Sequence, residues 1–446
     1  MMIEVREEIE TYRSHFAQLE KSLEGGEQRE PEWLHPMRKA AWERFTRQGF
    51  PSTNEEDWRF TSVVPLTQVA FQTAPVARRE EVEELCNRAR FRGWKGCELV
   101  FVNGRFVAEY SSLGGLPEGT IAGSLAEALR SHSEVAKSHL SRSSRLHENA
   151  FAALNTAFVE DGAFVFLPRD AAVEEPIHLI FLSSSGEQAT LSHPRNLIVA
   201  GTNSQARIVE TYAGGDGKTY FTNVVTEVVA GENATVDHYK LQREGDSAFH
   251  VASLHIRAAR SANVSNHSIS LGARLARNDI HCLLDGEGSE CSLNGLYVVS
   301  GEQHVDHHTL IDHARPHCTS RELYKGILDG CSQAVFNGRI IVRPDAQKTD
   351  ARQTNKNLLL SSKALVNTNP QLEINADDVK CAHGATIGQL DADALFYLRS
   401  RGIELGTARS LLTNGFMSDI SNRIKIETIR SYLESVVFVS LPQGSG

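Results

Sequence analysis

The stretch NVVTEVVAGENA, residues 223–234, joins a seven-residue run rich in valine to a short polar turn. β-Branched side chains favour strands, whereas glycine and asparagine favour turns. Runs of the same kind, four to seven residues long, recur at 196–199, 252–256 and 339–342. Four to seven residues is an ordinary strand length. We therefore predict an all-β segment from about Gly162 to Ile387.

The spacing of the turns indicates how these strands are arranged. Turn phrases begin at Gly231, Arg260 and Gly286, at intervals of 29 and 26 residues. A loose period in this range is typical of stacked coils, in which each coil packs on its neighbours. A sandwich or closed barrel would have a similar density of strands. The pattern favours a parallel β-helix over those two folds.

Helical patterns flank the β segment on both sides. Apolar residues from Val5 to Leu23 recur at steps of three and four, and further helices are expected at 36–48 and 80–90. Asn103-Gly104 between two apolar runs predicts a hairpin. We expect a mainly helical domain with this hairpin at 1–135, a β-helix core at 145–388 and a helical domain at 389–446.

Three helices are expected after the β segment. Asp391 can cap the first, which would end near Gly402, and the second would run from Leu405 to Asn414-Gly415. A third would carry an apolar face from Ile420 to Val436. That face needs a cover, either the last coil of the β-helix or a partner.

Composition excludes several classes of function. The chain has 446 residues and a net charge of −10, so a general nucleic-acid binder or a protein of anionic membranes is not expected. No apolar run is long enough to span a bilayer, and the acidic N-terminus lacks an export signal. Seven cysteines without a CxxC pair favour reduced thiols. We expect a cytoplasmic protein.

Two segments superficially resemble known ligand-binding motifs. Gly214–Thr219 lacks the first glycine of a phosphate loop and precedes a strand, so it is interpreted as a turn, and no ATP site is expected in this chain. The segment 303–320 contains five histidines and Cys318, but no fixed ligand pairs. A hydrogen-bonded polar patch is favoured there over a zinc site, with His304, Asp306 and His308 on one face and His307 on the other.

Cys381 and His383 form a second candidate metal site. They lie two residues apart, so on a strand both side chains leave the same face, and Gly384 would let another group approach. Thiolate and imidazole are ligands that iron and iron–sulfur clusters prefer. Two ligands make only half a site, so a second subunit would have to complete it. The spacing alone favours a buried cysteine beside a hydrogen-bonded histidine.

Longer phrases carry a family resemblance. The segments 306–330, 334–361 and 369–403 closely resemble the shared core of the SufB/SufD family of iron–sulfur cluster assembly proteins. Phe151–Phe158 and Glu56–Thr61 are similar to the SufD branch. SufB-like chains carry a glutamate where this chain has Gly384, and a cysteine near Thr354–Lys356, where none occurs here. The resemblance is therefore to SufD-like chains.

The resemblance implies a right-handed parallel β-helix between helical domains, acting as a non-catalytic scaffold subunit. It implies pairing with SufB through an edge of the β-helix, and docking of the ATPase SufC on the C-terminal helices. His383, with Cys381, would face a transient iron–sulfur cluster or iron ion shared with SufB. The candidate residues for SufC docking are Leu395, Phe396, Leu398, Ile403, Leu411 and Phe416.

Two other functions remain open from the residues alone. A β-helix can be a carbohydrate-active enzyme, although Asp377 and Asp378 show no convincing catalytic pairing. The chain could also be an inert structural adaptor or a homodimer, in which Cys381 and His383 have no chemical role.

Overall fold

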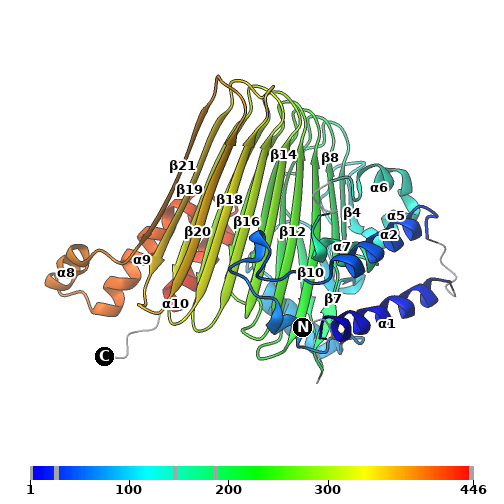
Figure 1. Ribbon diagram of the computed structural model, residues 1–446, viewed down its shortest axis with the longest axis horizontal. Coiled ribbons are helices and arrows are strands. Elements are labelled where there is room, and N and C mark those ends of the chain that lie inside the picture. Colours follow the sequence, from blue (N-terminus) through cyan, green and yellow to red (C-terminus); the bar gives the residue numbers. More distant parts are fainter. Residues whose placement is uncertain (1–3, 25–29, 144–147, 185, 187, 441–446) are drawn as a thin grey trace.

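The computed structural model describes residues 4–24, 30–143, 148–184, 186 and 188–440, and its centre is a parallel β-solenoid of two sheets (Figure 1). The first sheet has the order β20 Leu365–Ile374, β18 Gln333–Val342, β16 His304–His313, β14 Leu275–Leu284, β12 Phe249–Ala258, β10 Tyr220–Ala230, β8 Arg195–Ala200, β5 Ala163–Leu167 and β4 Ile121–Ser124. The short strands β7 Thr190–Ser192 and β1 Gln72–Thr73 join it beside β10.

The second sheet contains the alternate strands of the chain. Its order is β21 Lys380–Gly388, β19 Asp350–Leu359, β17 Thr319–Leu328, β15 Glu290–Val299, β13 Asn263–Ser270, β11 Thr235–Gln242, β9 Gln205–Gly214, β6 Ile177–Ser183, β2 Glu98–Val102 and β3 Arg105–Phe106. From β9 onward each strand pairs in parallel with the strand two places later, so one strand from each sheet makes a coil. The predicted parallel β-helix is confirmed.

The predicted turn phrases form the corners of successive coils. Asn233, Ser261 and Gly288 each have a positive φ, of 57°, 53° and 68°. Their backbone N–H groups donate to carbonyl oxygens of the next coil, as Asn233 does to Arg260 at 3.0 Å. Turn residues that tolerate left-handed backbone therefore set the period of the solenoid.

The N-terminal helices cover one end and one face of the solenoid. Their bounds are α1 Glu4–Glu24, α2 Leu34–Gln48, α3 Val64–Thr67, α4 Arg79–Ala89, α5 Leu125–Ser131, α6 Ser133–His139 and α7 Ala150–Ala157, with short 3₁₀ turns at Glu56–Trp58 and Ala108–Tyr110. The three predicted helices are confirmed, as is the hairpin, in which β2 and β3 pair antiparallel around Asn103-Gly104. This hairpin also extends the second sheet, because β2 pairs in parallel with β6.

The C-terminal helices are α8 Ala392–Ser400, α9 Leu405–Ser421 and α10 Glu427–Ser440. The predicted cap is confirmed, since the Asp391 carboxylate accepts from the backbone N–H groups of Asp393 and Ala394. The predicted end of the second helix was wrong, because α9 continues through Asn414-Gly415. Burial of Met417 and Ile420 further along α9 outweighs the helix cost of one glycine, about 1 kcal/mol.

The predicted start of the third helix was also wrong. Ile420 lies on α9 and Ile424 precedes α10, so the apolar stripe is divided between two helices. Its cover is the outer face of the second sheet, including Tyr239, Leu296 and Ile327. Among the described residues, no member of β20 or β21 belongs to this cluster. Within the described residues, no helix combines the length and the apolar character needed to cross a bilayer.

Candidate functional site

The last coil leaves one end of the solenoid open. Strand β21 pairs only with β19, and β20 only with β18, among the described strands. All positions of β21 are exposed except Cys381, which is half-buried, whereas in β17 eight of ten positions are buried. An uncovered strand edge can pair with another chain. This end of the solenoid is therefore a candidate interaction surface.

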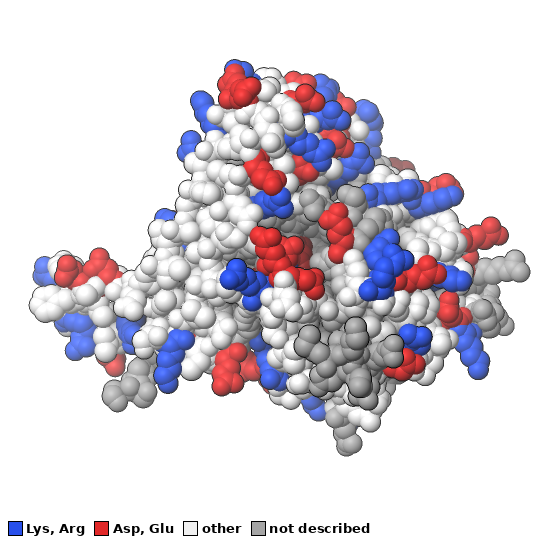
Figure 2. All heavy atoms as spheres, viewed as in Figure 1, with Lys and Arg blue, Asp and Glu red and all other residues white. Residues whose placement is uncertain are grey.

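The side chains on this end are largely uncharged, and several are exposed and apolar. Leu365, Ile374 and Ile387 are 50%, 43% and 48% exposed, although Ile374 and Ile387 take up inward positions of the coil. Strands β20 and β21 together carry only two charged residues, Glu373 and Lys380. Figure 2 shows few charged side chains over these last strands. Exposed core positions of this kind mark interaction surfaces in folded proteins.

The structure brings Cys381 and His383 together on this open end. In the register with β19, Cys381 lies beside Ala351 and His383 beside Gln353, and Ala351 and Gln353 both face the interior. Cys381 packs against the apolar core, and burial raises the pKa of its thiol. The His383 residue is exposed, and a side-chain atom added at Gly384 would meet nothing within 4 Å.

These two residues alone cannot complete a metal site. No group of three or more His, Cys, Asp and Glu residues able to hold a metal occurs in the part of the chain that the structure describes. A tetrahedral metal or a cluster iron takes four ligands. Cys381 and His383 could supply two of them, and the exposure of His383 leaves room for ligands from a second chain.

The six candidate docking residues of the C-terminal helices differ in exposure. Phe396 on α8 and Leu411 on α9 are 74% and 45% exposed. Leu395, Leu398 and Ile403 are partly buried. Phe416 packs beside the second sheet, with the Lys325 ammonium 4.5 Å from its ring centroid. Figure 1 shows α8 projecting beyond the last coil.

Two neighbours on this surface were not predicted from the sequence. Tyr397 and Leu405 are also exposed, beside Phe396 and near Leu411 in the chain. Tyr397 lies on α8, which has no buried residue, so no buried stripe distinguishes its exposed face. Leu405 is the first residue of α9. These four exposed residues, Phe396, Tyr397, Leu405 and Leu411, are called the α8–α9 patch below.

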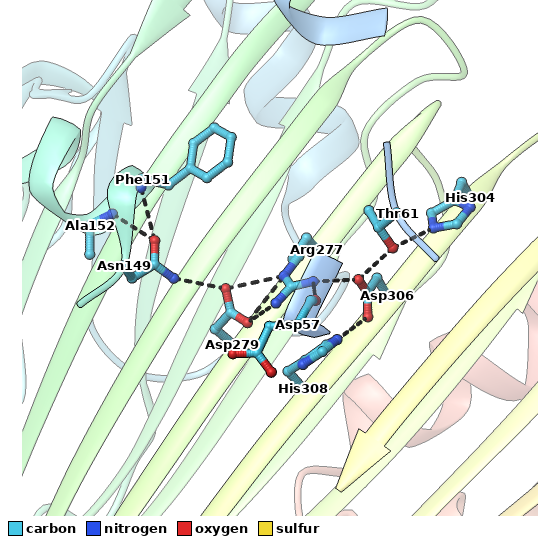
Figure 3. Close-up of polar contacts among 10 residues, drawn as sticks. All are labelled: Asp57, Thr61, Asn149, Phe151, Ala152, Arg277, Asp279, His304, Asp306 and His308. Carbon is cyan, nitrogen blue, oxygen red and sulfur yellow. Dashed lines mark hydrogen bonds and ion pairs between the residues drawn. The ribbon is translucent and has the colours of Figure 1, made fainter. Parts of the chain in front are cut away.

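The histidine-rich segment forms a hydrogen-bonded network, as favoured above (Figure 3). Arg277 donates to Asp306 at 2.7 Å and pairs with Asp279 at 2.8 Å. His308 pairs with the second oxygen of Asp306 at 3.1 Å, and the Thr61 hydroxyl donates to Asp306 at 2.6 Å. Burial acts to raise the pKa of Asp306, but Arg277 and His308 outweigh it and hold that pKa well below its usual range.

This network attaches the N-terminal segment to the first sheet. Arg277 also donates to the carbonyl of Asp57, and its guanidinium lies 3.8 Å from the ring centroid of Trp58. As predicted, His307 faces the opposite way and stacks on Tyr297 inside the solenoid. Asp306 Oδ2 accepts from Arg277 and from Thr61, and Oδ1 lies 3.1 Å from His308 Nε2, so the network is structural. The Gly214–Thr219 segment is a turn between β9 and β10, also as predicted.

The fold and the open end define a class of protein: a parallel β-solenoid with an exposed terminal coil that carries a thiol and an imidazole. Two family models match the chain. One, described as the SufBD core domain of SUF-system FeS cluster assembly, matches residues 181–416, and the SufBD N-terminal region matches residues 6–179. The chain therefore belongs to the SufB/SufD family of iron–sulfur cluster assembly proteins.

Similar curated proteins agree with this assignment. An iron–sulfur cluster assembly SufBD family protein of Synechocystis is 35% identical, over 87% of this chain and 86% of its own length. The iron–sulfur cluster assembly protein SufD of Escherichia coli is 28% identical over 92% of this chain and 94% of its own. The iron–sulfur cluster assembly protein SufD of Bacillus subtilis is 27% identical over 92% of this chain and 94% of its own length.

Proposed function

We propose that this chain is the SufD-like, non-catalytic subunit of a cytoplasmic SufB–SufC–SufD scaffold that assembles iron–sulfur clusters. The observation that carries the proposal is the open last coil, on which Cys381 and His383 occupy inward positions among exposed apolar residues. The SufD names of the relatives support the choice of branch. A SufB subunit would cover this end by pairing its own strands with β20 and β21.

In this arrangement the nascent cluster, or iron, is cargo held between two chains. His383 is exposed and can bind through a ring nitrogen without a change in the fold. The raised pKa of Cys381 keeps it a thiol until a metal ion displaces the proton. SufB would supply the remaining ligands, because the described residues of this chain offer only two at this end.

The α8–α9 patch is the proposed contact for SufC, which would supply ATP hydrolysis. Four exposed apolar side chains on a projecting helical unit are suited to a protein groove. Phe396→Asp should abolish co-purification of SufC while SufB is retained. Val76→Asp, at a distant apolar residue that is almost fully exposed, is the control and should retain both partners. Retention of SufC by Phe396→Asp would refute this contact.

The cluster site is tested by anaerobic reconstitution of the three-protein complex with His383→Ala. We expect assembly of the complex to be unchanged, and formation of the visible iron–sulfur absorption bands to be slowed at least about tenfold. His35→Ala, at an exposed histidine on α2, is the matched control. Cluster formation at the wild-type rate in His383→Ala would exclude this residue. A homodimer that forms in preference to the complex with SufB would favour the adaptor alternative.

A further inference from the structure

An inward-facing ladder of side chains leads from the interior of the solenoid to His383. In the parallel register Glu322 on β17 pairs with Gln353 on β19, and Gln353 pairs with His383 on β21. Neighbouring strands lie about 4.8 Å apart, so registered side chains on one face stack directly on one another. Glu322 and Gln353 are both buried, whereas His383 is at the exposed end of the ladder.

The Gln353 amide is held in one orientation. Its Nε2 donates to Glu322 Oε2 at 2.6 Å. Gly338 in the opposite sheet makes room for this amide, because a Cβ atom at position 338 would lie only 2.0 Å from Gln353 Nε2. With the nitrogen directed at Glu322, the carbonyl oxygen Oε1 is left free, and it has no hydrogen-bond partner among the described residues. A buried, unpaired carbonyl in a native fold requires an explanation.

We propose that Gln353 is a positioning residue for His383, its Oε1 accepting the ring N–H of His383 when the other ring nitrogen binds cargo. This inference rests on the proposed function of His383. A metal-bound histidine normally donates its second N–H to a carbonyl or carboxylate, which fixes the tautomer and the ring orientation. Gln353 is the registered neighbour of His383, and the free acceptor belongs to it. Glu322 contributes indirectly, because its carboxylate accepts from the Gln353 amide and so holds that amide in place.

The test measures Co²⁺ binding, as a spectroscopic substitute for iron, in the complex with SufB and SufC. Gln353→Met keeps the side-chain length and removes the acceptor, and it should weaken Co²⁺ binding about tenfold. Asn355→Leu is the matched control, because Asn355 is buried on the same strand but registers with Ala385. It should leave Co²⁺ binding unchanged.

A double exchange tests whether an acceptor oxygen at position 353 is sufficient for the proposed role. In Glu322→Gln/Gln353→Glu the amide and the carboxylate trade places, so the hydrogen bond between them is kept and residue 353 still has an oxygen that can accept from His383. Co²⁺ binding should return to within about threefold of wild type, with the wild-type absorption band. A merely structural role would instead weaken Co²⁺ binding equally in Gln353→Met and Asn355→Leu, because each change removes a buried amide from β19.

His383→Ala, measured alongside, distinguishes the possible failures. If His383→Ala weakens Co²⁺ binding while Gln353→Met binds as tightly as wild type, the role of Gln353 is refuted and that of His383 stands. If neither variant changes binding, both proposals fail. Weakened binding in Gln353→Met that the double exchange does not restore would also refute the positioning role.

Discussion

The first coil of the solenoid is covered by the chain itself, whereas the last coil is bare. At the first coil, β2 and β3 close the second sheet and β4 pairs antiparallel with β5 in the first. Helices α5 and α6 pack on the outer face of β5 and β8, and α4 packs on β6. As a result β6 is buried along its whole length, whereas β21 is exposed at all positions but one.

The difference favours the open end as the proposed interface. The covered end terminates in β3 and β4, of two and four residues, which are too short to template another sheet. The open end presents strands of ten and nine residues with an apolar inner face. Full-length strands left open at one end, with the other end capped, are suited to the proposed pairing with strands of a partner.

Removing an aromatic ring at the covered end should have the largest effect on stability. Phe101 on β2 is fully buried and stacks on Phe181 with ring centroids 4.7 Å apart. Phe101→Ala should lower the free energy of unfolding by about 4 kcal/mol, because it opens a cavity under the cap. Urea denaturation measures this loss. Leu365→Ala, at the open end, should cost less than about 1 kcal/mol, and equal losses would mean that the two ends are covered alike.

Breaking the network of Figure 3 should have the next largest effect. Arg277→Ala leaves the buried Asp306 carboxylate without its guanidinium partner. This change should lower the free energy of unfolding by about 3 kcal/mol at neutral pH. Arg257, paired with Asp285 at 2.6 Å on the surface, is the matched control, and Arg257→Ala should cost less than about 1 kcal/mol.

The cost of Arg277→Ala should also depend on pH. The folded protein holds the pKa of Asp306 below its unfolded value, so this carboxylate contributes stability above the unfolded pKa and loses it as pH falls. The difference in free energy of unfolding between wild type and Arg277→Ala should therefore become smaller below about pH 4. A gap that is constant from pH 7 to pH 3 would mean that packing against Trp58, not charge, is the main contribution.

The interior ladder should show the opposite pH dependence. Burial raises the pKa of Glu322 from 4.5 to about 7. Between these values the unfolded chain releases a proton that the folded chain keeps, so wild type loses stability as pH rises. Relative to Glu322→Gln, that loss should reach about 2 to 3 kcal/mol by pH 7.5, measured by urea denaturation. Glu290→Gln, at an exposed position of β15, should follow wild type at every pH.

The solenoid could be predicted from sequence, but its polar interior could not. β-Branched runs and turn residues such as Asn233 specify strands and corners locally, so they are visible in the chain. Glu322 and Gln353 face inward, against the rule that polar residues face solvent, so alternation alone gives no reason to place them inside. The signal that could have found them is the coil period, since 322, 353 and 383 lie 31 and 30 residues apart.

The candidate pair was predicted more completely than its surroundings. Two residues two apart on a strand share a face whatever the fold, so Cys381 and His383 could be placed together from spacing. The helix boundaries failed at Gly415 because the packing of Ile420 on the second sheet is a tertiary effect. Local propensity contains no information on such a contact.

The open end itself should give the smallest change in stability and the clearest change in binding. Ile387 occupies an inward position but is 48% exposed, so Ile387→Asp should alter the free energy of unfolding of the isolated chain by less than about 0.5 kcal/mol. In the complex, the introduced carboxylate would be buried against the partner without a counter-ion, and SufB should no longer co-purify. Val76→Asp should retain SufB, because Val76 lies far from the last coil in the chain and is almost fully exposed. If Ile387→Asp retains SufB, the bare coil is not the contact, and the contrast between the two ends must have another cause.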